Sequence, residues 1–255
     1  MQEVFLSRKA WTDYGNFLFT TARVEKGNII WLDSHFERLS FAVRRVFHKV
    51  LKRSLLSYLK SNLLKKKLSH FNRLRIAVRL IEDSLLVEIY PSYTRTEPVI
   101  PLSILATEAK FFPKRNFHKG QRYDFFDSAR KRVIKNGFDE RAFFYEDSIL
   151  EGSYGSFLGV RDDLLFVPAF SWIESITLKK ITSFLTDEHS FKVSSEPLAL
   201  SSLSSLDSLI HLNCFRLARP IKLVVNSRAE SLFHSEASIL APAIQSFNGL
   251  FSGPL

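Results

Sequence analysis

The chain has 255 residues, of which 45% are hydrophobic and 13% aromatic. That much apolar surface excludes a disordered chain and predicts one large folded domain or two small ones. Cys214 is the only cysteine, which excludes an internal disulfide and favours a reducing compartment. Because the sequence has no apolar signal core near Met1 and no apolar run long enough to span a bilayer, we expect a cytoplasmic protein without a membrane partner.

The net charge is +10, from 36 Lys and Arg against 26 Asp and Glu. Much of the excess lies between Arg38 and Arg79. Such charge can attract nucleic acid, but no zinc-finger spacing and no RNP-like aromatic motif accompanies it. We therefore predict no nucleic-acid partner and interpret the charge as the solvated faces of two helices. The same charge also draws in a small anionic substrate or cofactor.

Patterning in the first half of the chain predicts a hairpin followed by two helices. A strand over 18–24, turn residues and a returning strand over 29–32 form the hairpin. Ser34 and Glu37 have the spacing of a capping box, which predicts that a helix starts there. A second helix is predicted over 55–68, where leucines recur on one face.

Farther along, short elements alternate between strand and helix. Apolar residues at every second position predict a strand over 74–80, and turn residues at 82–84 lead into a second strand over 85–90. The remaining predicted elements are a helix over 124–135 ended by Gly137, strands over 142–145, 157–160 and 164–167, and a helix over 176–185. This order favours an α/β fold with two domains. We predict a small domain over 1–110, a linker over 111–118 and a large domain over 119–255.

Two segments near the N-terminus carry a family resemblance. Residues 14–24 (YGNFLFTTARV) and 35–39 (HFERL) are similar to the opening hairpin and the H-x-x-R-L block of the class IV, or fold-type IV, pyridoxal-phosphate enzymes. The resemblance implies that Arg38 binds the cofactor phosphate, which suits a guanidinium's planar fork of donors. A lone arginine on a helix is otherwise a solvated face.

A third block, KGQRY at 119–123, resembles the family's K-x-x-N-Y. It implies that Lys119 holds pyridoxal 5'-phosphate as a Schiff base and that Tyr123 contacts the cofactor. A neutral amine attacks an aldehyde well, and burial near cations lowers the pKa of an amine. Arg122 replaces the usual Asn. The alternative is a solvated basic loop.

The fourth block, LEGSYGSFL at 150–158, is similar to T-E-G-S-x-S-N-x-F and is the most specific of the set. The resemblance implies that Glu151 lies against the pyridine nitrogen. A carboxylate there keeps the nitrogen protonated, so the ring can accept electrons. Ser156 stands where Asn is usual.

Two further blocks complete the resemblance. Ser175, Ile176 and Thr177 resemble G-I-T-R, which implies phosphate binding by Ile176 and Thr177 at a helix N-terminus; the alternative is plain N-cap chemistry, and Leu178 replaces the Arg. Residues 212–220 (LNCFRLARP) look like a block of the lyase branch and imply that Cys214 lies near the phosphate. We do not predict Cys214 as a nucleophile, because no base is paired with it.

The run over 19–23 lacks the Glu common in transaminases, so the resemblance is closest to the lyase branch. It implies a 4-amino-4-deoxychorismate lyase of folate biosynthesis, which eliminates pyruvate and leaves 4-aminobenzoate. The resemblance implies that Lys119 is the base and that Glu151 supports the ring, while the proton for the leaving group comes from Lys119 or from a water held by Thr21. Lys114 and Arg115 are candidate clamps for the substrate carboxylates.

Two alternatives stay open. A class IV aminotransferase acting on branched-chain or D-amino acids would use the same lysine. A catalytically degenerate member would keep only the fold, in line with the departures at Arg122, Ser156, Ser175 and Leu178. The resemblance further implies a homodimer, and a two-domain fold with a small α/β N-terminal domain and a larger C-terminal pseudobarrel.

Overall fold

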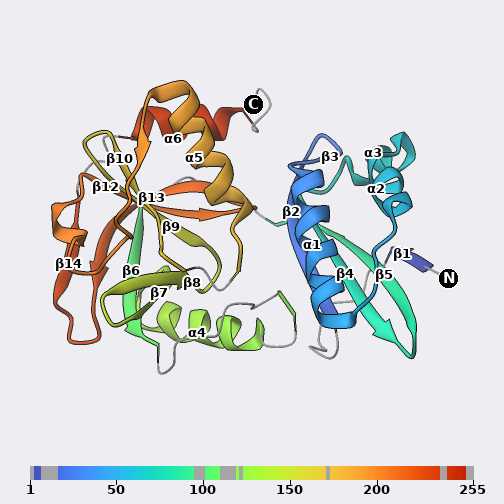
Figure 1. Cartoon of the computed structure of the whole chain (residues 1–255), viewed down its shortest axis with the longest axis horizontal. Coiled ribbons are helices and arrows are strands. Elements are labelled where there is room, and N and C mark those ends of the chain that lie inside the picture. Colours follow the sequence, from blue (N-terminus) through green and yellow to red (C-terminus); the bar gives the residue numbers. More distant parts are fainter. Residues whose placement is uncertain are drawn as a thin grey trace. The chain divides into compact units, whose positions relative to one another are not determined.

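The computed structural model describes residues 3–6, 17–94, 101–109, 119–120, 123–170, 173–235 and 240–250 (Figure 1). These residues form two compact units. The first unit contains the described residues up to 94 together with residues 119–120 and 123–124. The second contains the described residues from 101 to 109 and from 125 to 250. The linker predicted over 111–118 lies outside the described residues, and the domain division stays a prediction.

The first unit is built on a five-stranded sheet with the order β1-β5-β4-β2-β3. Its strands are β1 (Glu3–Leu6), β2 (Phe17–Glu25), β3 (Asn28–Ile29), β4 (Arg73–Ile81) and β5 (Ser84–Ser92). β2, β4 and β5 pair antiparallel, and β1 joins β5 in parallel. Its helices are α1 (Leu32–Phe47), α2 (Arg53–Lys60) and α3 (Asn62–Leu68).

One face of this sheet packs on the helices, and α1 lies along it (Figure 1). Leu18, Ile76 and Val78 point from the strands into a core that includes Leu39 and Val43 of α1. Full burial of each such side chain stabilises the fold by about 1.5–3 kcal/mol. Because side chains alternate along a strand, the intervening residues of β2 and β4 occupy the other face.

The predicted start of the first helix is wrong. The returning strand ends at Ile29, and Trp31 adopts a left-handed conformation with φ 52° and ψ 38°. The helix therefore begins at Leu32, and Ser34 lies inside it rather than capping it. The left-handed residue reverses the chain within one position, so that Leu32 reaches the core.

The helix predicted over 55–68 is interrupted at Ser61. That residue has an extended conformation with ψ 145° and ends α2. Its hydroxyl accepts a hydrogen bond from the backbone N–H of Leu64 at 3.4 Å, so it caps α3. Serine favours such a cap because its side chain replaces a missing backbone acceptor.

The second unit contains a mixed sheet that curls, with the order β11-β10-β9-β12-β13-β6-β7-β8 and β14 paired to β13. Its strands are β6 (Leu102–Glu108), β7 (Glu140–Tyr145), β8 (Ser148–Gly152), β9 (Ser156–Arg161), β10 (Leu164–Phe166), β11 (Lys192–Val193), β12 (Ser208–Asn213), β13 (Leu217–Val225) and β14 (Ser231–His234). β6 pairs in parallel with both β7 and β13, while β9, β12 and β13 pair antiparallel. This architecture confirms the predicted α/β class.

Three helices and one 3-10 turn accompany that sheet. They are α4 (Tyr123–Lys135), α5 (Ile176–His189), α6 (Ala241–Gly249) and η1 (Leu203–Ser205). α5 contacts β9, β12 and β13, and Figure 1 shows α5 beside α6 on the opposite side of the sheet from α4. Gly137 follows α4 with φ +83°, as predicted for a residue that ends a helix. In the described part of the chain, no helix has the length and apolar character needed to cross a membrane.

Candidate active site

The block containing Lys119 is docked on β2 in the first unit. The Lys119 carbonyl accepts a hydrogen bond from the Phe19 N–H at 2.8 Å, and Gly120 forms a bridge with Leu18. A Cβ on Gly120 would lie 2.5 Å from the Phe17 carbonyl oxygen, so this position requires glycine. The backbone contact fixes Lys119 beside Phe19, near the start of β2.

Aromatic contacts complete this docking. The Tyr123 ring packs edge-on against Phe19 with centroids 5.0 Å apart, and the Lys119 Nζ lies 5.6 Å from the Tyr123 centroid. Such aromatic and cation–π contacts each contribute about 0.5–1.5 kcal/mol. The structure therefore brings together two residues of the K-x-x-N-Y-like block, Lys119 and Tyr123, on the β2 strand that carries Thr21.

Arg75 lies on the same face of the sheet as Phe19 and Thr21, and sequence reasoning missed it. It is directly opposite Thr21 in the β2–β4 register, and its Nε donates to the Thr21 Oγ1 at 3.4 Å. Its guanidinium stacks 4.6 Å from the centroid of Phe19. The alternation along β4 predicts one buried face and does not distinguish Arg75 from Arg73 or Arg79, whereas the pairing with β2 does. Arg79, on the same face of β4, forms an ion pair with Glu88 at 2.6 Å.

Arg38 is anchored on the helix-covered face of β2. Its Nη2 donates to the Thr20 Oγ1 at 2.7 Å, and the same hydroxyl lies 2.7 Å from the Nδ1 of His35. The Thr20 hydroxyl can donate one hydrogen bond and accept two, so the direction of its bond with the His35 Nδ1 depends on the imidazole tautomer. Thr20 and His35 are fully buried. Neither was singled out from the sequence, although both lie within the quoted blocks.

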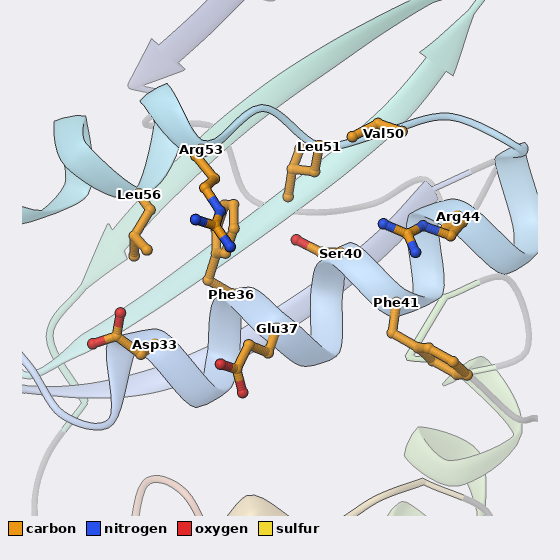
Figure 2. Close-up of a pocket in the computed structure, with 10 residues that line it drawn as sticks. All are labelled: Asp33, Phe36, Glu37, Ser40, Phe41, Arg44, Val50, Leu51, Arg53 and Leu56. Atoms are coloured by element: carbon orange, nitrogen blue, oxygen red, sulfur yellow. The ribbon is translucent and has the colours of Figure 1, made fainter.

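A hollow of about 570 Å³ lies on the outer side of α1 (Figure 2). Phe36, Glu37 and Arg44 line it from the helix, and Leu51 and Arg53 line it from the segment that follows. Arg38 leaves the same helix toward Thr20 of β2 instead. The lining thus includes Phe36 and Glu37 of the block at 35–39, but not Arg38.

Glu151 is buried in the second unit. It lies on β8 opposite Phe143 of β7, and its side chain is 6% exposed. Its Oε2 accepts a hydrogen bond from the Ile173 N–H at 2.9 Å. Since Ile173 lies just before α5, this carboxylate ties β8 to the start of that helix.

The α5 N-terminus combines capping with spare donors. Ser175 is the N-cap, and its hydroxyl accepts from the Leu178 N–H at 3.2 Å. The N–H groups of Ile176 and Thr177, in the first turn, have no intrahelical acceptor. The Thr177 hydroxyl is buried without a hydrogen-bond partner among the described residues. A bound phosphate suits these donors and the helix dipole.

The remaining predicted residues are less informative. Ser156, where the family has Asn, is fully buried on β9, with its hydroxyl unpaired among the described residues. Cys214 lies in the turn after β12 and is partly buried. The Asn213 side chain closes that turn by accepting from Phe215 N and Arg216 N at 3.0 and 2.7 Å. Two predicted clamps, Lys114 and Arg115, lie outside the described residues, as does Arg122.

Comparisons with solved structures agree with this fold. A candidate 4-amino-4-deoxychorismate lyase of Legionella pneumophila matches with a TM-score of 0.78 and 14% identity, covering 98% of this chain and 99% of that one. A hypothetical aminotransferase of Mycobacterium tuberculosis, in its α-ketoglutarate- and PMP-bound form, matches with 0.77 and 13%, covering 91% and 87%. The Escherichia coli branched-chain amino acid aminotransferase matches with 0.74 and 16%, covering 94% and 86%. At such identities the likeness shows the fold alone.

Sequence comparison gives the family. No curated relative matches the chain. The model of the amino-transferase class IV family, however, matches residues 17–224, which span β2 to β13 and include Lys119, Glu151 and the α5 N-terminus. This match confirms the predicted resemblance: the chain belongs to the class IV aminotransferase family.

Proposed function

We propose that the chain is a pyridoxal-phosphate enzyme that eliminates pyruvate from 4-amino-4-deoxychorismate and leaves 4-aminobenzoate. The observation that carries the proposal is the docking of Lys119 on β2, beside the Thr21–Arg75 pair. A reactive amine and a carboxylate-binding guanidinium then belong to one unit. The run over 19–23, nearer the lyase branch than the transaminases, supports the choice of reaction.

The residues present fit the cofactor. Its chemistry is to accept the electron pair left behind when a bond to the amine-bearing carbon breaks. Lys119 would hold it covalently, with Tyr123 and Cys214 against it. Glu151 would keep a proton on the ring nitrogen. Arg38 and the Ile176–Thr177 helix start would bind the phosphate, for which the most direct support is the Thr177 hydroxyl, buried without a partner in the described part of the chain.

The protein's own groups divide the remaining work. The Lys119 amine removes the proton from the substrate carbon. Arg75 binds one substrate carboxylate through its planar donors, next to Thr21. Lys114 and Arg115 are proposed for the other carboxylate. A proton returns to the departing pyruvate carbon from Lys119 or from a water held by Thr21.

Turnover without an amino acceptor tests the reaction. Supplied with 4-amino-4-deoxychorismate and no keto acid, the protein should form 4-aminobenzoate and pyruvate over many cycles, and Lys119→Ala should not. A transaminase cannot do this, because it must regenerate its cofactor with an acceptor. If the protein forms no product from 4-amino-4-deoxychorismate but exchanges amino groups between leucine or D-alanine and 2-oxoglutarate, the family assignment stands. The proposed lyase activity is then wrong, and the protein is an aminotransferase.

The pathway, the cellular location and the oligomeric state belong to the same proposal. A lyase of this kind serves folate biosynthesis, in the cytoplasm, and we propose that it works as a homodimer. Light scattering of the purified protein tests the dimer, whose expected mass is twice the 29.4 kDa of the chain.

A further inference from the structure

A buried acid and a buried imidazole meet in the second unit, outside the motifs used so far. Glu140 begins β7 and His211 lies on β12. Each is 3% exposed, and the Glu140 Oε2 is 3.6 Å from the His211 Nε2. Burial of two such groups costs free energy unless their polar atoms are used, so their contacts indicate what they support.

Glu140 holds one side of the turn that follows Glu151. Its Oε1 accepts hydrogen bonds from the N–H of Arg141 at 2.8 Å and from the N–H of Ser153 at 3.1 Å. Ser153 lies in the turn over 152–155 between β8 and β9, which is closed by a bond from Gly152 N to Gly155 O at 2.7 Å. One carboxylate oxygen therefore connects the start of β7 to this turn.

His211 supports the other side of the same turn. A Cβ on Gly155 would lie 2.6 Å from the His211 Nε2 and 2.2 Å from the Leu212 carbonyl oxygen. The turn backbone thus rests directly on the imidazole edge and on β12. The Phe157 ring, 5.6 Å from the imidazole centroid, packs beside it.

The charge states of the pair follow from burial. Burial raises the pKa of the Glu140 carboxyl, while the Ser153 and Arg141 donors and Arg130 oppose that rise. Burial, together with Arg219, Arg216 and Arg130, lowers the pKa of His211 to about 3. His211 is therefore uncharged at neutral pH, and the support acts through the hydrogen bonds of Glu140 and the packing of the imidazole rather than as an ion pair.

We infer that Glu140 and His211 form a buried support that positions the Glu151 carboxylate for the cofactor ring nitrogen. Glu151 immediately precedes the supported turn, and its own Oε2 is committed to Ile173. A carboxylate that must meet one ring atom needs its backbone held within a fraction of an ångström, which partners behind it provide. Glu140 and His211 are positioning residues, and this inference rests on the proposed function.

Two substitutions of Glu140 separate positioning from folding. Glu140→Gln keeps an oxygen that can accept from Ser153 N, whereas Glu140→Leu fills the space without an acceptor. Glu146→Gln, exposed at the other end of the β7–β8 hairpin, is the matched control. The measurements are the melting temperature, amide hydrogen exchange over 150–157 in the cofactor-free protein, and titration with pyridoxal 5'-phosphate followed by the absorption of the bound cofactor.

We expect Glu140→Leu to speed exchange over 150–157, to weaken cofactor affinity on the order of tenfold and to change the absorption of the bound cofactor. Glu140→Gln should stay close to the wild type in hydrogen exchange, cofactor affinity and absorption, and Glu146→Gln should match the wild type in all three. Wild-type affinity and absorption in a folded Glu140→Leu protein would overturn the inference, even with a lower melting temperature.

His211→Leu provides a second route, because it leaves both Glu140 Oε1 bonds in place. We expect faster exchange over 150–157 and a several-fold weaker cofactor affinity. If Glu140→Leu does not fold, His211→Leu tests the inference alone. Unchanged hydrogen exchange and unchanged cofactor affinity in His211→Leu would contradict it. Failure of the wild-type protein to bind the cofactor would instead contradict the proposed function, while exchange in the cofactor-free variants would still report on the support.

Discussion

The charged candidate residues of the two units differ in sign and in exposure. In the first unit they are the cations Lys119, Arg38 and Arg75, all partly exposed on or beside β2. In the second unit the charged candidate is the carboxylate of Glu151, which is buried, as are the hydroxyls of Thr177 and Ser156. Partly exposed cations attract anions such as phosphate and carboxylates from solvent. A buried carboxylate suits a ring nitrogen that must be held in one place.

The two threonines of β2 repeat this contrast within a single strand. Thr20 points to the helices, where it is buried and accepts from Arg38. Thr21 points to the other face and accepts from Arg75. Neighbouring residues with the same side chain thus contact two different arginines that we propose as anion ligands, because alternate residues of a strand lie on opposite faces.

The largest expected effect comes from substitution of Lys119, a cation of the first unit. Lys119→Ala should lower kcat on the order of a thousand-fold, since it removes both the covalent hold and the base. Lys131→Ala, exposed on α4, should behave as the wild type. Borohydride reduction and peptide mapping of the cofactor-loaded protein should place a pyridoxyl group on Lys119. A label on a different lysine would remove Lys119 from the site.

Arg38 is the next test of the first unit. Arg38→Ala removes a charge-assisted hydrogen bond of about 1.5–3 kcal/mol, so cofactor affinity should fall about tenfold to a hundredfold. Arg44→Ala changes the same helix on its outer side, where Arg44 lines the hollow in Figure 2, and should leave the affinity unchanged. Equal affinities in the two variants would place the phosphate elsewhere.

Burial of His211 in the second unit should make the free energy of unfolding depend on pH. His211 has a pKa of about 3 when folded and about 6.5 when unfolded. The unfolded chain binds the extra proton first, so stability is complete above pH 6.5 and falls as the pH drops toward 3. At pH 5 the loss is about 2 kcal/mol.

Urea unfolding of His211→Asn measures the contribution of His211 to the pH dependence of the free energy of unfolding. The variant should lose less stability than the wild type between pH 7 and pH 5. Glu140, whose raised pKa acts in the opposite direction, is present in both proteins, so the difference isolates His211. His234→Asn, exposed on β14, should keep the wild-type slope. Equal slopes in wild type and His211→Asn would mean that the imidazole is not held uncharged.

The smallest effect concerns the helix that we propose for the phosphate. Thr177→Val removes a buried hydroxyl that has no partner among the described residues. The cofactor-free protein should keep its stability or gain up to about 1 kcal/mol, while cofactor affinity falls about three- to tenfold. Thr182→Val removes a second such hydroxyl from α5 and should leave the affinity unchanged. Equal effects of the two substitutions on affinity would exclude a special role for Thr177.

The sequence by itself determined the α/β class, the family blocks and the elements with strong local signals. The strand β4 follows from alternation, and β2 and β5 from strand-like residues beside turn residues. The helix α4 follows from its helical pattern, and its end from Gly137, a residue free to take positive φ. Ser175 was recognisable as an N-cap because capping involves only near neighbours in the chain. Motif order indicated the family, since each block is local.

Only the tertiary structure decided what depends on distant residues. β8, which carries Glu151, is buried almost throughout and shows no alternation. Arg75 stands out among the arginines of β4 only through its register with Thr21. The Glu140–His211 contact joins residues 71 positions apart, at 140 and 211. Register and burial are set by pairing across the whole sheet, so no local pattern contains them.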